Sequence, residues 1–171
     1  MKDKAKLMEN IWIEYHPKLQ VYLKQILPGS VDLEDRVSDI LVKVIAQIDS
    51  YNPEFALSTW IYRIARNTQI DEIRKIKPIE AEYDDEIITN SETPEDLFFK
   101  QYNLESIREC IEILSPHQRE LIFLYFYEGK NYREISEITE IPVGTLKFRM
   151  SCCKKIIKDS LEKEHKHANN Y

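Results

Sequence analysis

The sequence predicts an all-α protein made of two small helical domains joined by an acidic linker. Three observations lead to this fold class. The 171 residues include only 3 glycines, and apolar residues recur three or four positions apart in several segments, as on one face of a helix. Residues 78–95 interrupt this pattern with two prolines and a cluster of acidic side chains, a composition typical of a linker. We therefore expect one domain over residues 1–77 and a second over residues 96–171.

The first domain is predicted to contain three helices. The first spans residues 5–27, and we expect a kink or a break at Pro17, because proline removes a backbone donor from a helix. The second begins near Asp32 and the third near Ser58, each a residue type that caps helix N-termini. Residues 50–57 between them are expected to form a loop.

The second domain is predicted to contain four helices. Ser115 and Gln118 have the spacing of a capping box, and Gly129 is the natural end of the helix that they begin. Asn131 and Glu134 repeat the capping pattern at the start of the next, shorter helix.

Residues 131–150 have the pattern of a short helix, a tight turn and a second helix. Pro142 lies at the turn, where it can begin a helix but cannot continue one. The second helix has an apolar stripe with cations off that stripe, namely Leu146, Met150 and Cys153 against Lys147, Arg149 and Lys154. This pattern is typical of a helix-turn-helix, which places side chains in a DNA major groove. An ordinary helical hairpin remains the alternative.

Charge is distributed unevenly along the chain. The net charge of −6 argues against a protein that binds DNA freely. However, residues 58–77 carry five Lys or Arg against two acids, and residues 130–171 carry nine against six. Residues 78–100, between them, carry one Lys against eight acids. Each basic segment can therefore present a local positive field to phosphate.

Several classes of protein are excluded by what the sequence lacks. No apolar run reaches the roughly 20 residues that span a bilayer, so we expect no stable membrane insertion. The charged start does not have the pattern of a signal peptide, and 3 cysteines without a repeated spacing point to the reducing cytoplasm. We find no metal-ligand spacing, no nucleophile–base pair and no Gly-rich phosphate loop. We therefore expect no enzymatic activity, metal or cofactor.

Four segments, taken in order, resemble bacterial sigma-70-type factors, most closely the extracytoplasmic function (ECF) group. Residues 32–41 resemble the polymerase-docking helix of that group, and residues 55–67 resemble its promoter-melting segment. Residues 114–121 and 141–147 resemble its −35-binding domain. The resemblance covers nearly the whole chain. It implies two helical domains, called regions 2 and 4, with core RNA polymerase and promoter DNA as partners and a cognate anti-sigma factor as a further candidate.

The resemblance implies that the second helix docks on a coiled coil of the largest polymerase subunits. The candidate residues are Asp35, Val37, Ser38, Asp39 and Leu41. Ser38 and Asp39 stand where the family usually has Gln-Glu, which keeps the charge but shortens the reach. The alternative is a solvated helix face above a core stripe.

The loop at residues 50–57 corresponds in the family to a pocket for a flipped-out base of the −10 element. Such a pocket needs an amide and an apolar or aromatic wall, and cations on the next helix would follow the separated strand. The candidate −10 residues are Tyr51, Asn52, Phe55, Leu57, Arg63, Arg66, Asn67 and Arg74. We interpret Trp60 as structural. In the alternative, the loop side chains only pack the loop against the core.

The first turns of the last helix are expected to meet the base edges of the −35 element. The candidate residues are Arg133, Gly144, Thr145, Lys147, Phe148, Arg149 and Ser151. Lys147 can reach guanine acceptors, while Gly144 and Thr145 suit a phosphate at the helix N-terminus. Phe148 and Cys152 depart from the family, in which Ser and Arg are common.

The expected function is that of a sigma factor, with region 2 opening the −10 element and region 4 reading the −35 element. A stand-alone helix-turn-helix regulator is the alternative. It predicts duplex binding without polymerase, and it leaves residues 32–67 without a role. A helical interaction protein with no DNA role would leave Lys147 and Arg149 idle.

Overall fold

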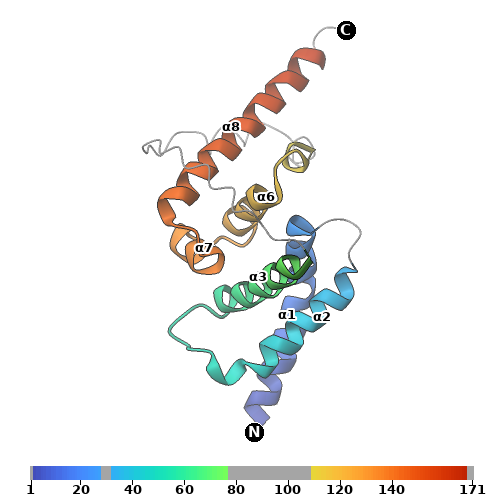
Figure 1. The fold of residues 1–171 in the computed structure, drawn as a ribbon, viewed down its shortest axis with the longest axis vertical. Coiled ribbons are helices and arrows are strands. Elements are labelled where there is room, and N and C mark those ends of the chain that lie inside the picture. Colours follow the sequence, from blue (N-terminus) through green and yellow to red (C-terminus); the bar gives the residue numbers. More distant parts are fainter. Residues whose placement is uncertain (1, 28–31, 77–108, 169–171) are drawn as a thin grey trace.

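The computed structural model describes residues 2–27, 32–76 and 109–168, and these residues form helices and short connections without a strand (Figure 1). The elements are α1 (Lys2–Ile26), α2 (Leu33–Ala46), η1 (Ile48–Ser50), α3 (Leu57–Ile76), α6 (Pro116–Ile122), η3 (Phe123–Tyr127), α7 (Tyr132–Thr139) and α8 (Val143–Ala168). The predicted all-α class is confirmed. The predicted linker, residues 78–95, lies outside the described residues, as do the predicted domain boundaries at residues 77 and 96.

Helix α1 is the long element of the first helical unit, and it packs against α2 (Figure 1). Its buried side chains follow helical spacing, with Ile11, Tyr15, Leu19 and Tyr22 on one face. Pro17 lies inside the helix, and the chain passes through it without a break. The break that we considered at this position therefore does not occur.

Helices α2 and α3 complete the first unit. Asp32 caps α2 as predicted, because its carboxylate accepts hydrogen bonds from the backbone N–H groups of Glu34 at 3.0 Å and Asp35 at 3.4 Å. The predicted cap of α3 at Ser58 was wrong by two positions, because the first helical hydrogen bond runs from the Trp60 N–H to the Ala56 carbonyl. Helix α3 begins at Leu57, and Ser58 already belongs to its first turn.

The second unit is built from α6, α7 and α8. The predicted capping box at Ser115 is present, and a π-helical turn, η3, continues α6 to Tyr127. The chain then reverses at Gly129, whose φ of 64° lies in the left-handed region that glycine adopts without strain. The second predicted capping box, at Asn131, begins α7.

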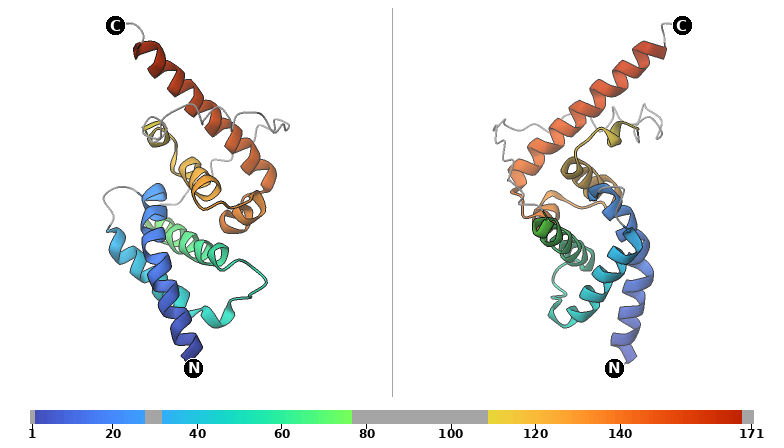
Figure 2. Two further views of the ribbon diagram at one scale, coloured as in Figure 1. Left: turned by 180° about the vertical axis from the view of Figure 1, so that it is seen from behind. Right: turned by 45° about the vertical axis from the view of Figure 1, so that its right-hand side comes forward.

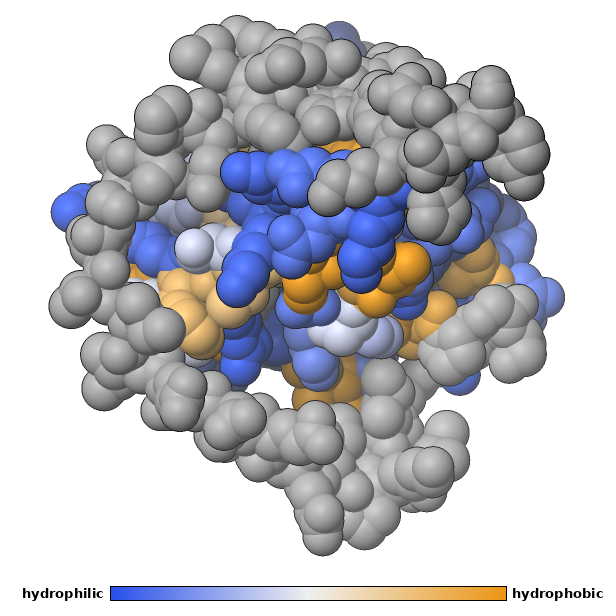
Figure 3. All heavy atoms as spheres, turned by 90° about the horizontal axis from the view of Figure 1, so that it is seen from above, coloured by the Kyte–Doolittle hydropathy of each residue, from blue (hydrophilic) through white to orange (hydrophobic). Residues whose placement is uncertain are grey.

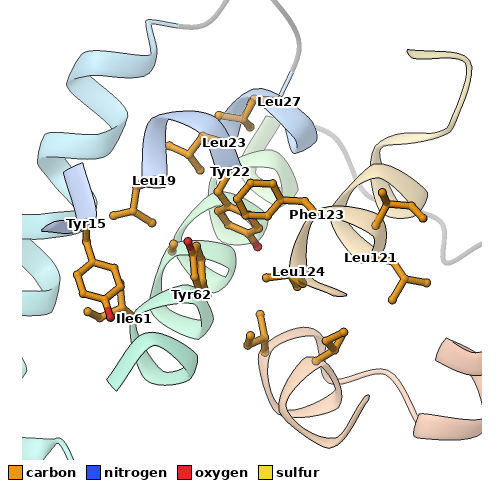
Figure 4. Packing of buried hydrophobic residues seen from close by; sticks show 14 of the residues in the cluster. Tyr15, Leu19, Tyr22, Leu23, Leu27, Ile61, Tyr62, Leu121, Phe123 and Leu124 are labelled. Carbon is orange, nitrogen blue, oxygen red and sulfur yellow. The ribbon is translucent and has the colours of Figure 1, made fainter. Parts of the chain in front are cut away.

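The two units pack on each other. Helix α6 contacts α1, and α7 contacts α3, as the views in Figures 1 and 2 agree. Aromatic rings connect the units: Phe123 lies 5.7 Å from Tyr22 and 6.3 Å from Tyr62, centroid to centroid. Figure 4 shows these three rings together, supplied by η3, α1 and α3. In the described residues, one hydrophobic core therefore runs through both units.

Candidate nucleic-acid interface

The turn between α7 and α8 is held by short local hydrogen bonds. Glu140 ends α7 in the left-handed region with φ of 58°, which is uncommon for a residue other than glycine. The Ser136 hydroxyl donates to the Ile141 carbonyl at 2.7 Å, and the Thr139 hydroxyl donates to the Ile135 carbonyl at 2.7 Å. The predicted helix–turn–helix is thus present, with its turn fixed from the α7 side.

The buried face of α8 is the predicted apolar stripe, continued along the helix. Its members share helical spacing and lie in the core: Leu146, Met150, Cys153, Ile157 and Leu161. This face packs on α6 and α7, so the opposite face of the first turns is left outward.

The outward face of α8 carries most of the residues predicted to read the −35 element. Gly144, Lys147 and Ser151 are exposed and recur three or four positions apart, so they share one side of the helix. Phe148 lies half-buried at the edge of that side. A Cβ added at Gly144 would meet no atom within 4 Å, so the backbone there is open to a close neighbour.

The remaining −35 candidates flank this side. Thr145 and Arg149 are half-buried and lie on the neighbouring stripe of α8, and Arg133 is exposed on α7. The structure therefore brings all seven predicted residues to the helix-turn-helix.

Helix α2 presents two of the five docking candidates openly. Asp35 and Asp39 are exposed and four residues apart, and Ser38 is half-buried beside them. Val37 and Leu41 are completely buried, because they belong to the apolar stripe that packs α2 into the core. Their predicted place on the docking surface was therefore wrong.

One exposed apolar residue on α2 was missed by the sequence analysis. Val42 follows Asp35 and Asp39 at helical spacing and is 58% exposed. The sequence contained a signal for Val42, because this β-branched residue shares its helical spacing with two carboxylates and not with the apolar stripe. Neighbouring Glu34 is engaged elsewhere, since its carboxylate accepts from Gln20 at 2.6 Å and contacts His16 at 3.0 Å.

The predicted −10 loop is closed by its own hydrogen bonds. The Tyr51 hydroxyl donates to the Phe55 carbonyl at 2.7 Å, and the Tyr51 ring packs on Trp60 with centroids 5.3 Å apart. Asn52 uses both ends of its amide on Glu54, accepting from its backbone N–H and donating to its carboxylate, each at 3.0 Å. Tyr51 is thus a support of the loop, and Trp60 is buried as predicted.

Two side chains of the loop remain available for contact with a base. Phe55 is 53% exposed, and Leu57 is half-buried at the start of α3. Asn52 is exposed, but a base that uses its amide must displace the Glu54 carboxylate.

Helix α3 presents only part of the predicted strand-binding row. Arg63 and Asn67 are exposed and four residues apart, so they share a side of the helix. The side chain of Arg74 is outside the described residues. Arg66, which we expected beside Arg63 on the open side, is buried with 8% of its surface exposed.

The reason for the burial of Arg66 is an ion pair with the second unit. Glu120 of α6 accepts from the Arg66 Nε at 3.1 Å and from the Tyr22 hydroxyl at 2.6 Å. Burial, followed by the negative charge of Glu120, raises the pKa of Tyr22 well above its usual value. The tyrosine therefore stays protonated and donates. The sequence signal for this pair was a carboxylate, Glu120, directly before the apolar residues 121–124.

A second polar contact joins α3 to α7. Lys130 donates to the Ser58 hydroxyl and lies 3.3 Å from the Glu134 carboxylate, which also accepts from the Thr59 hydroxyl at 3.0 Å. Burial acts to raise the pKa of Glu134, but the backbone hydrogen bond from Asn131 and the charge of Lys130 together lower it below its usual value. Glu134 is therefore ionised near neutral pH.

Neither a metal site nor a membrane-spanning helix is found in the part of the chain that the structure describes. No group of three His, Cys, Asp or Glu there could hold a metal ion, and no helix there is long and apolar enough to cross a membrane. Hydrophilic residues dominate the described part of the face in Figure 3, with smaller apolar patches between them.

Comparison with known proteins matches both units to one family. Residues 11–78 match the model of Sigma-70 region 2, and residues 104–151 match that of Sigma-70, region 4. The ECF RNA polymerase sigma factor SigW of Bacillus subtilis (strain 168) is 31% identical over 147 residues, which cover 80% of this chain and 79% of SigW. The ECF RNA polymerase sigma-E factor of Escherichia coli (strain K12) is 26% identical over 172 residues, covering 94% and 90%.

The fold is shared with a solved structure as well. The sigma factor RpoE from Bartonella quintana, crystallised with the anti-sigma factor NepR, superposes with a TM-score of 0.66 at 23% identity. The match covers 95% of this chain and 98% of RpoE. The chain belongs to the sigma-70 family of sigma factors, and within that family it is of the ECF type.

Proposed function

We propose that this chain binds core RNA polymerase and directs it to promoters, with region 2 opening the −10 element and region 4 reading the −35 element. One observation carries the proposal: the chain combines a helix-turn-helix that has an open basic face with a second unit that has an acidic helix face and an exposed aromatic loop. The subunit catalyses nothing itself and acts in the cytoplasm. It binds promoter DNA as part of the complex with polymerase, because a chain with a net charge of −6 has little affinity for DNA alone.

The polymerase contact is proposed for the outward face of α2. Asp35 and Asp39 supply two carboxylates on one side of the helix, with Ser38 beside them. Val42 adds an apolar side chain in line with the two carboxylates. A face that combines charge with an apolar side chain suits a basic coiled-coil surface, because the charges orient the partner and the apolar group is buried on contact.

The −35 contact is proposed for the first turns of α8. Lys147 reads base edges, and Ser151 adds a hydroxyl on the same side. The open backbone at Gly144, with Thr145, receives a phosphate at the helix N-terminus. Phe148 lies where it can contact a thymine methyl, and Arg149 and Arg133 hold the DNA backbone.

The −10 contact is proposed for the loop before α3 and for the exposed row on that helix. Phe55 and Leu57 provide an apolar wall for an extruded base, which Asn52 reads through its amide, while Tyr51 supports the loop. Arg63 and Asn67 hold the separated strand, with Arg74 as a further candidate. Arg66 can join them only after it leaves Glu120.

A protein inhibitor is proposed as a further partner. The structural relative RpoE is bound to an anti-sigma factor, NepR, and this chain has the same fold. We propose that a protein of that kind holds this chain inactive until a signal releases it.

The proposal is tested by reconstituting the purified chain with core polymerase and sequencing the transcript starts on genomic DNA. We expect start sites that share −10 and −35 elements, and none of them with core polymerase alone. The stand-alone regulator predicts instead that the chain binds a duplex tightly without polymerase and creates no new start sites. That result would reject the sigma function.

A further inference from the structure

Region 4 covers part of α3, the proposed strand-binding helix of region 2: Arg66 is buried, whereas Arg63 and Asn67 stay exposed. The side chains of Arg66 and Glu120 are only 10% and 4% exposed, although α3 and α6 belong to different regions. A buried guanidinium and a buried carboxylate each need a partner, because an uncompensated charge in the interior is strongly destabilising. Tyr22 completes the cluster, so three helices from both regions meet at one carboxylate.

Glu120 binds the guanidinium group of Arg66, which is the group that would bind a phosphate of a DNA strand. A guanidinium binds carboxylate and phosphate oxygens through the same N–H donors. Arg66 lies one turn beyond Arg63 and next to Asn67 in the sequence, so it belongs to the helix that is proposed to follow the separated strand. While Glu120 holds it, Arg66 cannot contact a phosphate.

A second contact places α7 over the start of α3. Lys130 and Glu134 engage Ser58 and Thr59, which directly follow the −10 loop. Aromatic packing of Phe123 on Tyr22 and Tyr62 joins the same two regions. Charged side chains therefore specify the closed arrangement at two places, and apolar burial adds to its stability.

We infer that the Arg66–Glu120 pair is an autoinhibitory latch, in which Glu120 stands in for a DNA phosphate and holds the free chain closed with Arg66 of its strand-binding helix covered. This inference rests on the proposed function, because it takes α3 to be the strand-binding helix. Core polymerase, by separating the regions, releases Arg66 to the −10 strand. The latch keeps the free subunit from occupying DNA on its own.

The first test measures the shape of the full chain. Glu120→Gln keeps the size of the side chain but leaves Arg66 buried without a counter-charge, and Arg66→Gln leaves Glu120 in the same state. Both variants are expected to show a larger radius of gyration by small-angle X-ray scattering, with helical content retained by circular dichroism. The control is Glu9→Gln, which makes the same change of charge at an exposed position of α1 and should scatter as the wild type.

The second test separates the latch from the role of Arg66 in binding. The probe is a short fluorescein-labelled single strand of mixed sequence, titrated without polymerase. Glu120→Gln is expected to bind it about tenfold more tightly than the wild type, because apparent affinity scales with the fraction of competent molecules. Arg66→Gln opens the chain but lacks the binding group, so it should show a much smaller gain.

The two proposals fail in different ways. If both variants scatter as the wild type does, there is no latch, whatever the chain does with polymerase. If Glu120→Gln opens the chain without a gain in strand binding, the contact is structural and does not occlude DNA. If the variants open and bind as expected, but neither they nor the wild type start transcription with core polymerase, the latch stands and the proposed sigma function fails.

Discussion

The two described glycines of region 4 differ in whether the fold requires a glycine at their position. Gly129 adopts a φ of 64°, where a side chain is strained, whereas Gly144 lies in the first turn of α8, where an added Cβ would have no atom within 4 Å. The first glycine is needed for the path of the chain. The second is not required by the fold, which is consistent with a role in close contact with DNA.

Alanine at these positions is expected to have effects of opposite sign on stability. Gly129→Ala should lower the free energy of unfolding by about 1–2 kcal/mol, because an L residue is strained in the left-handed region. Gly144→Ala should raise it by up to about 1 kcal/mol, because alanine is the better helix former. Urea unfolding followed by circular dichroism measures both, and a loss of stability at Gly144 would contradict the open backbone seen there.

Lys147 is expected to read sequence, whereas Lys155, exposed farther along the same helix, is not. Lys147→Ala should cost about 1–3 kcal/mol of discrimination at one base pair of the −35 element. Lys155→Ala removes the same charge as a matched control and should leave sequence choice unchanged. Transcription from a library of −35 sequences at fixed salt measures the difference. Equal relaxation in both variants would show that the reading face lies elsewhere.

At the scale of elements, α2 separates its roles by face. Its buried stripe holds the first unit together, and its outward face carries Asp35, Asp39 and Val42. Substitutions on the outward face can therefore change binding without opening the core.

Replacing both carboxylates of α2 is expected to abolish binding to core polymerase. The double variant Asp35→Lys/Asp39→Lys reverses the charge of the face but leaves the core stripe intact, so the helical content should be retained. Asp159→Lys/Glu162→Lys makes the same change of charge on an exposed part of α8 and serves as the control. Pull-down with core polymerase measures the outcome. Unchanged affinity of the α2 variant would remove the docking assignment.

The −10 loop has a separate prediction, which concerns melting. Phe55→Ala and Asn52→Ala are expected to impair opening of a duplex promoter, and much less so of a template already mismatched at −10, where the unpairing cost of a few kcal/mol is absent. Ile13→Ala, at an exposed apolar position of α1, is the control. Permanganate reactivity of thymines on both templates measures the two steps. If the variants fail equally on both templates, the loop side chains only pack against the core and do not take part in melting.

Local signals made much of the element structure predictable. Capping residues fixed the starts of α2, α6 and α7, and helical spacing identified the buried stripes of α2 and α8. The wrong prediction for Arg66 has a physical origin, because periodicity marks a face as polar without saying what covers it. Arg66 has the spacing of an exposed cation, yet Glu120, 54 positions away, neutralises and buries it.

Assigning function to helix faces was limited for other reasons. Val37 and Leu41 were placed on the docking surface by resemblance alone, although their apolar spacing already indicated a core position. Val42, at an outward position, was overlooked. The loop residues remain predicted candidates, and the hydrogen bonds that occupy Asn52 depend on a backbone turn that the sequence pattern did not reveal.

At the scale of the whole molecule, the two regions are one folded body in this state. Phe123 packs between Tyr22 and Tyr62, and buried residues continue from one region into the other (Figure 4). The proposed latch requires the regions to separate when the chain reads two promoter elements. The apolar surface that is buried between them must then be covered by the polymerase or exposed to water.

This shared core limits how freely the regions can be recombined. A hybrid that joins region 2 of this chain to region 4 of a relative would retain Arg66, Tyr22 and Tyr62 but would receive whatever residues the donor has in place of Glu120 and Phe123. Where the donor lacks an acid at that position, the hybrid would emerge from synthesis already open. Designers of orthogonal transcription switches would therefore have to exchange the matched residues together with the domain.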